Sequence, residues 1–211
     1  TSKAKHMAGF VNKFYSLGYN VLAADARAHG DSEGTKIGMG WPERFDVIEW
    51  IKLIISWEPN AQIILHGVSM GAATVLMASG EELPENVKAI IADCGYTSEW
   101  DEFKCEANAL HIPWFPVLNA ASVMSRLRDG YDFKQASALE QVKQSRIPTL
   151  FIHGSDDELV PYSMLDKLYS AAACEKECLT VNGAGHALSS SVEPELYWNT
   201  VESFIDKYLE K

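Results

Sequence analysis

Short apolar runs alternate with longer segments of helical periodicity along this chain. The short runs are apolar at consecutive positions, which is typical of parallel strands that are covered on both faces. The expected strands are residues 21–24, 63–65, 89–92, 150–152 and 179–181. The expected helices are residues 7–17, 41–55, 70–80, 162–173 and 194–209. Strands that alternate with helices predict the α/β fold class, with a mostly parallel sheet, right-handed crossovers and helices on both faces.

Residues 96–142 interrupt this alternation. The segment is rich in Trp and Phe and contains Pro113 and Pro116, so we expect a short, partly helical excursion that resembles a cap. We find no linker, and residues 1–211 are therefore expected to form a single domain. The aromatic side chains of the excursion either line an apolar acyl site or belong to the core, and the sequence leaves both alternatives open. They include Trp100, Phe103, Trp114 and Phe115.

Composition narrows the range of partners. The chain has 211 residues, and 29 acidic against 18 basic side chains give a formal net charge of −11. Such a chain repels nucleic acids and anionic membranes at long range, so we expect neither partner and favour a small neutral or cationic molecule. No apolar run approaches the roughly 18 residues of a membrane span. We expect a cytoplasmic protein, with an anchor or signal in an upstream segment left open.

The four cysteines are Cys94, Cys105, Cys174 and Cys178. Their spacing fits no C-x-x-C pattern, and no paired histidines complete a zinc site. We therefore interpret them as free thiols and expect neither a metal nor an organic cofactor.

The strongest chemical signal is the sequence Gly67-Val68-Ser69-Met70-Gly71. It follows an expected strand and precedes an expected helix, as in a nucleophile elbow. Flanking glycines would relieve the crowding of a sharp turn, so that the Ser69 hydroxyl projects at the carboxyl end of the sheet. The helix N-terminus would favour a developing oxyanion, with the backbone N–H of Met70 as the first donor. We predict that Ser69 is a catalytic nucleophile.

A serine nucleophile needs a base, and His186 is the best of six histidines. It lies in a glycine-rich loop between the last expected strand and the last expected helix, from which an imidazole can reach the elbow. His66 should point into the sheet, and His153 is better explained as a structural residue at the end of a strand. His29 lies in a turn, where we expect hydrogen bonds that brace the site.

The base in turn needs a carboxylate that fixes its tautomer. Three acids follow the expected strand at 150–152, and we select Asp157 among them, with Asp93 as the alternative. The chain order Ser69, Asp157, His186 is the order expected of an α/β-hydrolase.

These motifs together resemble the α/β-hydrolase superfamily, in particular the bacterial branch of serine aminopeptidases and BEM46-like hydrolases. Residues 25–34 resemble the D-x-R-G-H-G-x-S loop of that branch, with Ala28 in place of a glycine. Residues 153–161 resemble its H-G-x-x-D-x-x-V-P loop, whose aspartate falls on Asp157, and Gly185-His186 resembles its G-H base loop. The resemblance covers essentially the whole chain and implies the α/β-hydrolase fold.

The resemblance also implies strands that this sequence lacks. The superfamily carries a second oxyanion donor in a loop after a strand that precedes its first helix, whereas this sequence enters a helix near Met7. We therefore expect an N-terminally incomplete domain. The strand at 21–24 would lie two strand positions from the strand at 63–65, and a missing segment would complete the sheet.

The predicted function is that of a serine hydrolase with a Ser69–His186–Asp157 triad that acts on a small-molecule carboxylic ester or related acyl substrate. A peptidase that resembles aminopeptidases is the first alternative. A non-catalytic binding protein on the same fold is the second, although such proteins usually lack a triad member and none is missing here.

Overall fold

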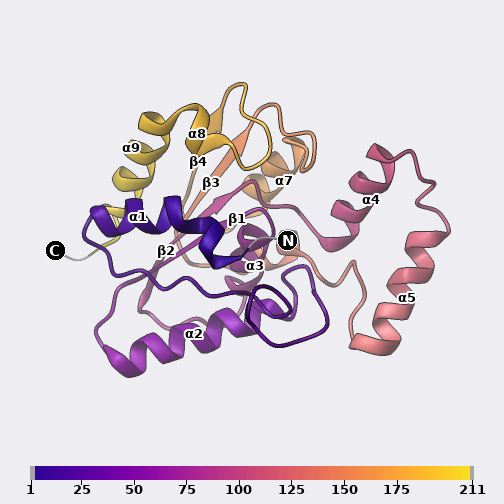
Figure 1. The fold of residues 1–211 in the computed structure, drawn as a ribbon, viewed down its shortest axis with the longest axis horizontal. Helices are drawn as coiled ribbons and strands as arrows, with labels where there is room; N and C mark the ends of the chain where they lie inside the picture. Colours follow the sequence, from indigo (N-terminus) through magenta and orange to yellow (C-terminus); the bar gives the residue numbers. More distant parts are fainter. Residues whose placement is uncertain (1–2, 210–211) are drawn as a thin grey trace. The chain divides into compact units, whose positions relative to one another are not determined.

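The computed structural model describes residues 3–209 of the chain, which forms two compact units, Thr1–Gly38 and Met39–Lys211. The second unit contains a four-stranded sheet (Figure 1). Its strands are β1 (Ile63–Val68), β2 (Val87–Asp93), β3 (Thr149–Gly154) and β4 (Lys176–Val181). They pair in the order β1-β2-β3-β4, and every neighbouring pair is parallel. Four of the five expected strands are thereby confirmed.

The register of the sheet brings the ends of the first three strands together. Val68 pairs with Asp93, and Asp93 pairs with Ile152. Because parallel strands all end at the same edge, the loops that follow β1, β2 and β3 leave the sheet side by side. The residues predicted to be catalytic follow strands of this sheet.

Helices cover both faces of this sheet, as expected. On one face, α3 (Met70–Ala78) packs on β1 and β2, and α7 (Ser163–Ala171) packs on β3. The helix α2 (Glu43–Trp57) packs on the outside of α3. Apolar side chains of the strands, such as Leu65 and Phe151, form one buried cluster with these helices.

The other face of the sheet is covered by α9 (Pro194–Ile205), which follows the short helix α8 (Ser189–Val192). Pro194 is the first residue of α9, a position that needs no backbone N–H. Tyr197, Val201 and Phe204 are fully buried on this helix.

The excursion at 96–142 consists of α4 (Glu99–Ala109), α5 (Val117–Asp129) and α6 (Ala138–Val142). Serine caps begin α4 and α6: Ser98 Oγ accepts the Asp101 N–H at 3.1 Å, and Ser137 Oγ accepts the Glu140 N–H at 3.2 Å. The same two serines pair in an isolated antiparallel bridge, so the excursion leaves and rejoins the sheet domain at one point. In Figure 1, α4 and α5 extend from this point as a helical hairpin. None of the helices in the described part of the chain has both the length and the apolar composition of a membrane span.

The first unit contains a short 3-10 helix, Ala4–Met7, and α1 (Ala8–Ser16). The strand expected at 21–24 is wrong, because these residues form no β-ladder and expose the apolar side chains of Val21 and Leu22. Apolar character alone does not make a strand, since a strand is defined by its hydrogen-bonded neighbour. No described strand pairs with the outer edge of β1, and the incompleteness of the domain stays a prediction.

The motif at 25–34 folds into a hydrogen-bonded turn around Asp25. The Asp25 carboxylate accepts the N–H of Ala4 at 2.6 Å and of Asp31 at 3.0 Å, and these bonds lower its pKa. A Cβ at Gly30 would lie 1.8 Å from this carboxylate, and Gly30 has a φ of 56°, so both the contact and the backbone favour glycine there. Ala28 has a φ of 59°, a conformation that the glycine of the related motif adopts without strain. The expected hydrogen-bonded turn is present, and its bracing role stays a prediction.

Candidate active site

Ser69 lies on a strained turn between β1 and α3. Its φ of 55° and ψ of −120° are unfavourable for a residue with a Cβ, as in a nucleophile elbow. A Cβ at Gly67 would lie 2.3 Å from the backbone of Gly71, so glycine is required at position 67. A Cβ at Gly71 would meet no heavy atom within 4 Å. The expectation that both glycines relieve a clash is therefore correct for Gly67 and wrong for Gly71.

The turn is held at the end of the sheet by its backbone. Ser69 N donates to the carbonyl of Asp93 at 2.8 Å, and the Ser69 carbonyl accepts the N–H of Ala73 at 3.0 Å. Since α3 begins at Met70, the N–H of Met70 belongs to the first turn, where amides have no partner within the helix. This arrangement supports an anion beside the serine hydroxyl.

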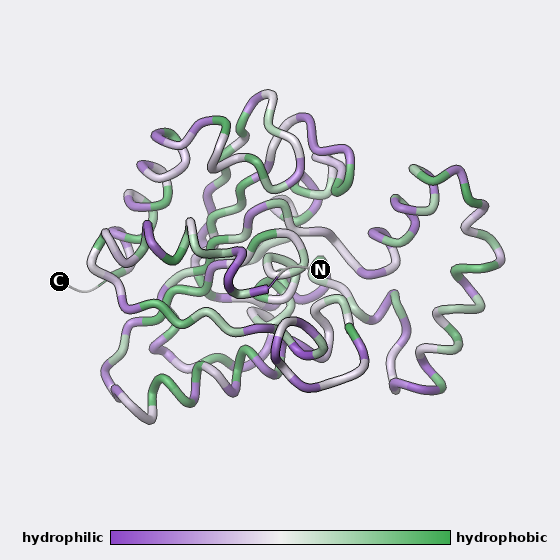
Figure 2. Tube along the Cα trace, in the orientation of Figure 1, coloured by the Kyte–Doolittle hydropathy of each residue, from purple (hydrophilic) through white to green (hydrophobic). Residues whose placement is uncertain are grey.

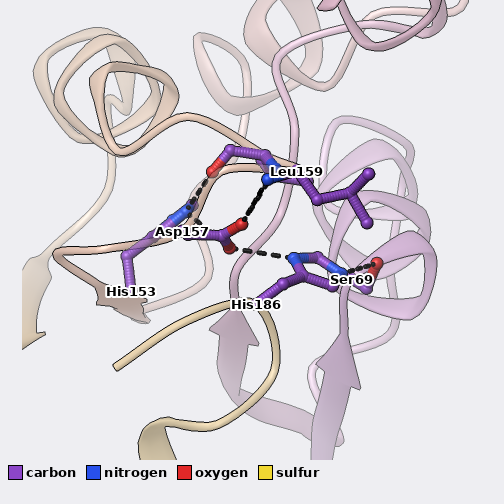
Figure 3. Close-up of polar contacts among 6 residues, drawn as sticks. Ser69, His153, Asp157, Leu159 and His186 are labelled. Atoms are coloured by element: carbon purple, nitrogen blue, oxygen red, sulfur yellow. Dashed lines mark hydrogen bonds and ion pairs between the residues drawn. The ribbon is translucent and has the colours of Figure 1, made fainter. Parts of the chain in front are cut away.

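His186 lies between Ser69 and Asp157 (Figure 3). Its Nε2 is 2.8 Å from Ser69 Oγ, and its Nδ1 is 2.8 Å from Asp157 Oδ2. A carboxylate only accepts hydrogen bonds, so Nδ1 carries the proton and Nε2 is left to accept the serine proton. The His186 side chain is 22% exposed, whereas that of Asp157 is fully buried. The structure therefore brings the three predicted residues together, while their catalytic roles stay a prediction.

The Asp157 carboxylate is held by more than His186. Its Oδ1 accepts the N–H of Leu159 at 3.0 Å and that of Val160 at 2.9 Å, as Figure 3 shows for Leu159. Burial on its own would raise the pKa of Asp157, but hydrogen bonds from His153, His186 and Val160 outweigh burial and lower the pKa well below its usual range. Asp157 thus stays ionised and fixed in orientation.

The acid loop and the base loop are tied to each other. Gly183 N donates to Ser155 Oγ at 2.8 Å, and Asp156 N donates to the Ala184 carbonyl at 3.0 Å. A Cβ at Gly154 would lie 2.1 Å from that carbonyl oxygen, which explains the glycine after His153. Sequence reasoning did not identify this contact, although the glycine was a signal for close backbone approach.

Two further residues at the ends of strands are buried near the triad: His153, expected to be structural, and Asp93, the alternative to Asp157. His153 is completely buried; its Nε2 is 2.9 Å from the Val160 carbonyl and 3.3 Å from Asp157 Oδ2. His153 therefore holds the acid loop in place, in agreement with its expected structural role. Asp93 is also buried, and the Nδ1 of His186 bonds to Asp157 rather than to Asp93. Burial raises the pKa of Asp93 to about 6, while the nearby Tyr197 hydroxyl lowers it.

Tyr197 is a residue that sequence reasoning missed. It is fully buried on α9, and its hydroxyl lies 3.3 Å from His66 Nε2. His66 points into the sheet domain as expected, and burial lowers its pKa to about 4, so it remains neutral. No signal in the sequence links these two residues, which are 131 positions apart.

One group of side chains has the spacing of metal ligands. Cys94 Sγ, an Asp157 oxygen and a His186 nitrogen all lie within 4.8 Å of one another. Burial raises the pKa of the Cys94 thiol, which disfavours the thiolate that a metal needs. Asp157 and His186 are moreover bonded to each other. These residues do not fit a metal centre.

The aromatic excursion contains an apolar hollow of about 330 Å³ between α4 and α5. Phe103 and Phe133 stack edge to face in its wall, with ring centroids 5.1 Å apart, and Trp114 also lines it. Some aromatic side chains therefore line an apolar space, while Phe115 is exposed. The two alternatives, that the aromatic side chains line an acyl site or that they belong to the core, both stay open.

The parallel sheet with helices on both faces, and the turn that carries Ser69, are those of an α/β-hydrolase fold. The profile of the prolyl oligopeptidase family matches residues 12–211, and the chain belongs to this family. The α/β-hydrolase superfamily inferred from the motifs is thereby confirmed.

The chain is 31% identical over 199 residues to the Bacillus subtilis protein YqkD, covering 93% of this chain and 65% of YqkD. It is 30% identical over 174 residues to the lysophosphatidylserine lipase ABHD12 of Macaca fascicularis, covering 82% of this chain and 43% of that protein. The chain thus spans less than two thirds of these relatives. The Pyrococcus furiosus esterase Pf2001 has the same fold, with a TM-score of 0.78 and 23% identity over 97% of this chain and 76% of that one.

Proposed function

We propose that this chain carries the catalytic centre of a serine hydrolase that cleaves carboxylic esters. The observation that carries the proposal is the position of the His186 ring, with Nε2 2.8 Å from Ser69 Oγ and Nδ1 2.8 Å from Asp157 Oδ2. A nucleophile, a base and a buried carboxylate in hydrogen-bonded sequence are the parts that acyl transfer needs. A non-catalytic binding protein would have no need of this alignment or of the strained Ser69.

In the proposed reaction, Ser69 Oγ attacks the ester carbonyl carbon while His186 Nε2 takes the hydroxyl proton. The resulting oxyanion is stabilised by the N–H of Met70. The tetrahedral intermediate then loses the alcohol, which takes the proton from His186 Nε2, and an acyl-serine remains. Water attacks the acyl-serine by the same path, so that the carboxylic acid leaves and Ser69 regains its proton. The negative charge of Asp157 stabilises the imidazolium of His186 during both acylation and deacylation.

An ester is favoured over an amide because the excursion offers an apolar hollow rather than a clamp for a peptide terminus. The lipase and esterase names of two similar proteins support the same choice. Amide hydrolysis is the second candidate, favoured by membership of the prolyl oligopeptidase family.

A panel of p-nitrophenyl esters of increasing acyl length, run beside aminoacyl p-nitroanilides, tests this proposal. We expect ester turnover, and a loss of about 10⁴-fold or more in Ser69→Ala, if the triad acts as a unit. Labelling of the wild type by a fluorophosphonate probe, absent in Ser69→Ala, would locate the nucleophile. Turnover of the anilides alone would reject the ester, and undiminished turnover in Ser69→Ala would reject the site.

A further inference from the structure

The helix α5 exposes its apolar stripe. Val117, Ala121, Met124 and Leu127 follow one another at intervals of three or four residues, which places them along one side of a helix. All four side chains are exposed, Leu127 by 77%. A helix on the surface of a globular domain normally turns such a stripe towards the core.

The buried side of α5 carries Leu118 together with two serines. Ser122 is buried and Ser125 half-buried, and both are bonded to the segment that follows the helix. Ser122 Oγ accepts the Phe133 N–H at 3.1 Å, and Ser125 Oγ donates to the Tyr131 carbonyl at 2.9 Å. Because these bonds fix the rotation of α5, the apolar stripe cannot turn inward without breaking them.

The exposed apolar surface continues into the connection between α4 and α5. Leu110, Ile112 and Phe115 are between 50% and 69% exposed, and Figure 2 shows apolar residues in green along much of this hairpin. We call the exposed apolar residues of this region the hairpin patch. Its members are Leu110, Ile112, Phe115, Val117, Val123, Met124 and Leu127. An apolar surface of this extent on one hairpin is typical of an interaction site.

The charge around the hairpin patch differs from that of the chain. Residues 107–128, between Glu106 and Asp129, contain no Asp or Glu, although acidic residues outnumber basic ones 29 to 18 overall. Arg126 and Arg128 are exposed near the end of α5 and precede and follow Leu127 in the sequence. At the base of the hairpin, Lys104 and Lys134 lie over the rings of Trp114 and Trp100, with Nζ 4.8 Å and 4.5 Å from the ring centroids. Apolar side chains with an arginine and tryptophan border match the interfacial zone of a bilayer.

We propose that the hairpin patch docks on the surface of an anionic lipid bilayer. The exposed stripe would enter the acyl boundary, while Arg126 and Arg128 would contact lipid phosphates. The expectation of no membrane contact came from the net charge, which acts at long range. Salt screens charges beyond about 8–10 Å, so the local charge of the patch decides binding at contact. A second copy is the other occupant to test, since the exposed Asp129 next to Arg128 could pair with an arginine across a two-fold axis.

Docking of this kind does not rest on the proposed hydrolysis, because it uses none of the triad residues. Co-sedimentation of the chain with vesicles measures it directly, with phosphatidylcholine vesicles compared with vesicles of equal parts phosphatidylcholine and phosphatidylglycerol. We expect binding to the mixed vesicles. The double substitution Met124→Glu/Leu127→Glu should lower the partition coefficient about tenfold or more. Arg126→Gln/Arg128→Gln should lower it about tenfold on mixed vesicles and leave binding to neutral vesicles unchanged.

The matched control is Trp57→Glu/Leu196→Glu, which makes the same change of charge at two exposed apolar residues outside the hairpin. This control should bind like the wild type. Absence of vesicle binding by the wild type, or an equal loss in the control, would overturn the proposal. Sedimentation velocity gives a further test. If the wild type is a dimer that does not bind vesicles, and Met124→Glu/Leu127→Glu dissociates this dimer, the patch belongs to a second copy and the proposal is overturned.

The two proposals fail separately in these measurements. Ser69→Ala should sediment with mixed vesicles as the wild type does, and the hairpin variants should keep turnover of p-nitrophenyl acetate in the absence of lipid. Vesicle binding without ester turnover would reject only the hydrolase, and turnover without vesicle binding would reject only the docking surface.

Discussion

The substitution Asp157→Asn replaces one carboxylate oxygen by an NH₂ group and preserves the shape of the side chain. Asp157 Oδ1 accepts two backbone N–H groups, at 3.0 Å and 2.9 Å, and Oδ2 accepts His186 Nδ1 at 2.8 Å. If the amide oxygen keeps both backbone bonds, its NH₂ group must face His186 Nδ1. A donor there favours the tautomer with the proton on Nε2, directed at Ser69 Oγ. The serine then has no base.

The magnitude follows from this geometry. The opposite orientation of the introduced amide would leave two backbone N–H groups facing a donor, at a cost of about 1–3 kcal/mol for each group left unsatisfied. The orientation that spoils the tautomer is therefore preferred. Loss of the correct tautomer in a serine triad lowers kcat by about 10⁴-fold, which corresponds to about 5.5 kcal/mol in the activation free energy.

Asp156→Asn is the matched control, because it removes the same charge one residue away. Asp156 is exposed, and its Oδ1 accepts only the Ser155 hydroxyl, at 2.6 Å, among the bonds that the described residues show. Its effect on p-nitrophenyl acetate turnover should stay within about twofold, as for most surface substitutions. The reasoning is refuted if Asp156→Asn is the more damaging change, or if Asp157→Asn loses less than about tenfold.

Four further substitutions test the packing and one buried carboxyl group. Gly67→Ala should lower the free energy of unfolding in urea by about 3 kcal/mol or more, because its Cβ would lie 2.3 Å from the backbone of Gly71. Gly71→Ala should be neutral or stabilising, and equal losses in the two variants would contradict this reasoning. Leu76→Ala, at a fully buried position, should cost about 2–5 kcal/mol, and a loss below about 1 kcal/mol would contradict the packing. Burial raises the pKa of Glu102 to about 8, because the folded protein favours the protonated carboxyl group. The contribution of Glu102 to the free energy of unfolding is therefore fully present below about pH 4.5 and is lost as the pH rises through 8. Glu102→Gln should therefore raise the melting temperature at pH 9 and not at pH 4; equal shifts would contradict this.

The sequence predicts the sheet well where burial and pairing coincide. The apolar runs that became β1 to β4 are buried because a neighbouring strand and helices cover them, so their composition reports their environment. Residues 21–24 have the same composition but no β-ladder. Pairing depends on a distant part of the chain, and a local run of four residues carries no information about that partner.

The site was predictable to the extent that each residue follows a strand. The elbow, the acid loop and the base loop leave β1, β3 and β4, and parallel strands bring their ends to one edge. Selection between Asp156 and Asp157 needed the spacing of the motif, and the structure buries Asp157 while it exposes Asp156. The contact between Gly154 and Ala184, and that between His66 and Tyr197, join distant segments and could not be predicted from local pattern.

The helix α5 illustrates a limit of a different kind. Periodicity along 117–129 gives the position of an apolar stripe on the helix surface, but not the direction in which the stripe points. That direction is decided by Ser122 and Ser125, whose hydroxyls satisfy backbone groups of residues 131 and 133. Net charge is limited in the same way, since a sum of −11 over the chain hides a stretch at 107–128 without an acid. An apolar stripe and a charge must both be placed in space before they indicate a partner. Here their positions favour a lipid surface, whereas the net charge alone disfavours it.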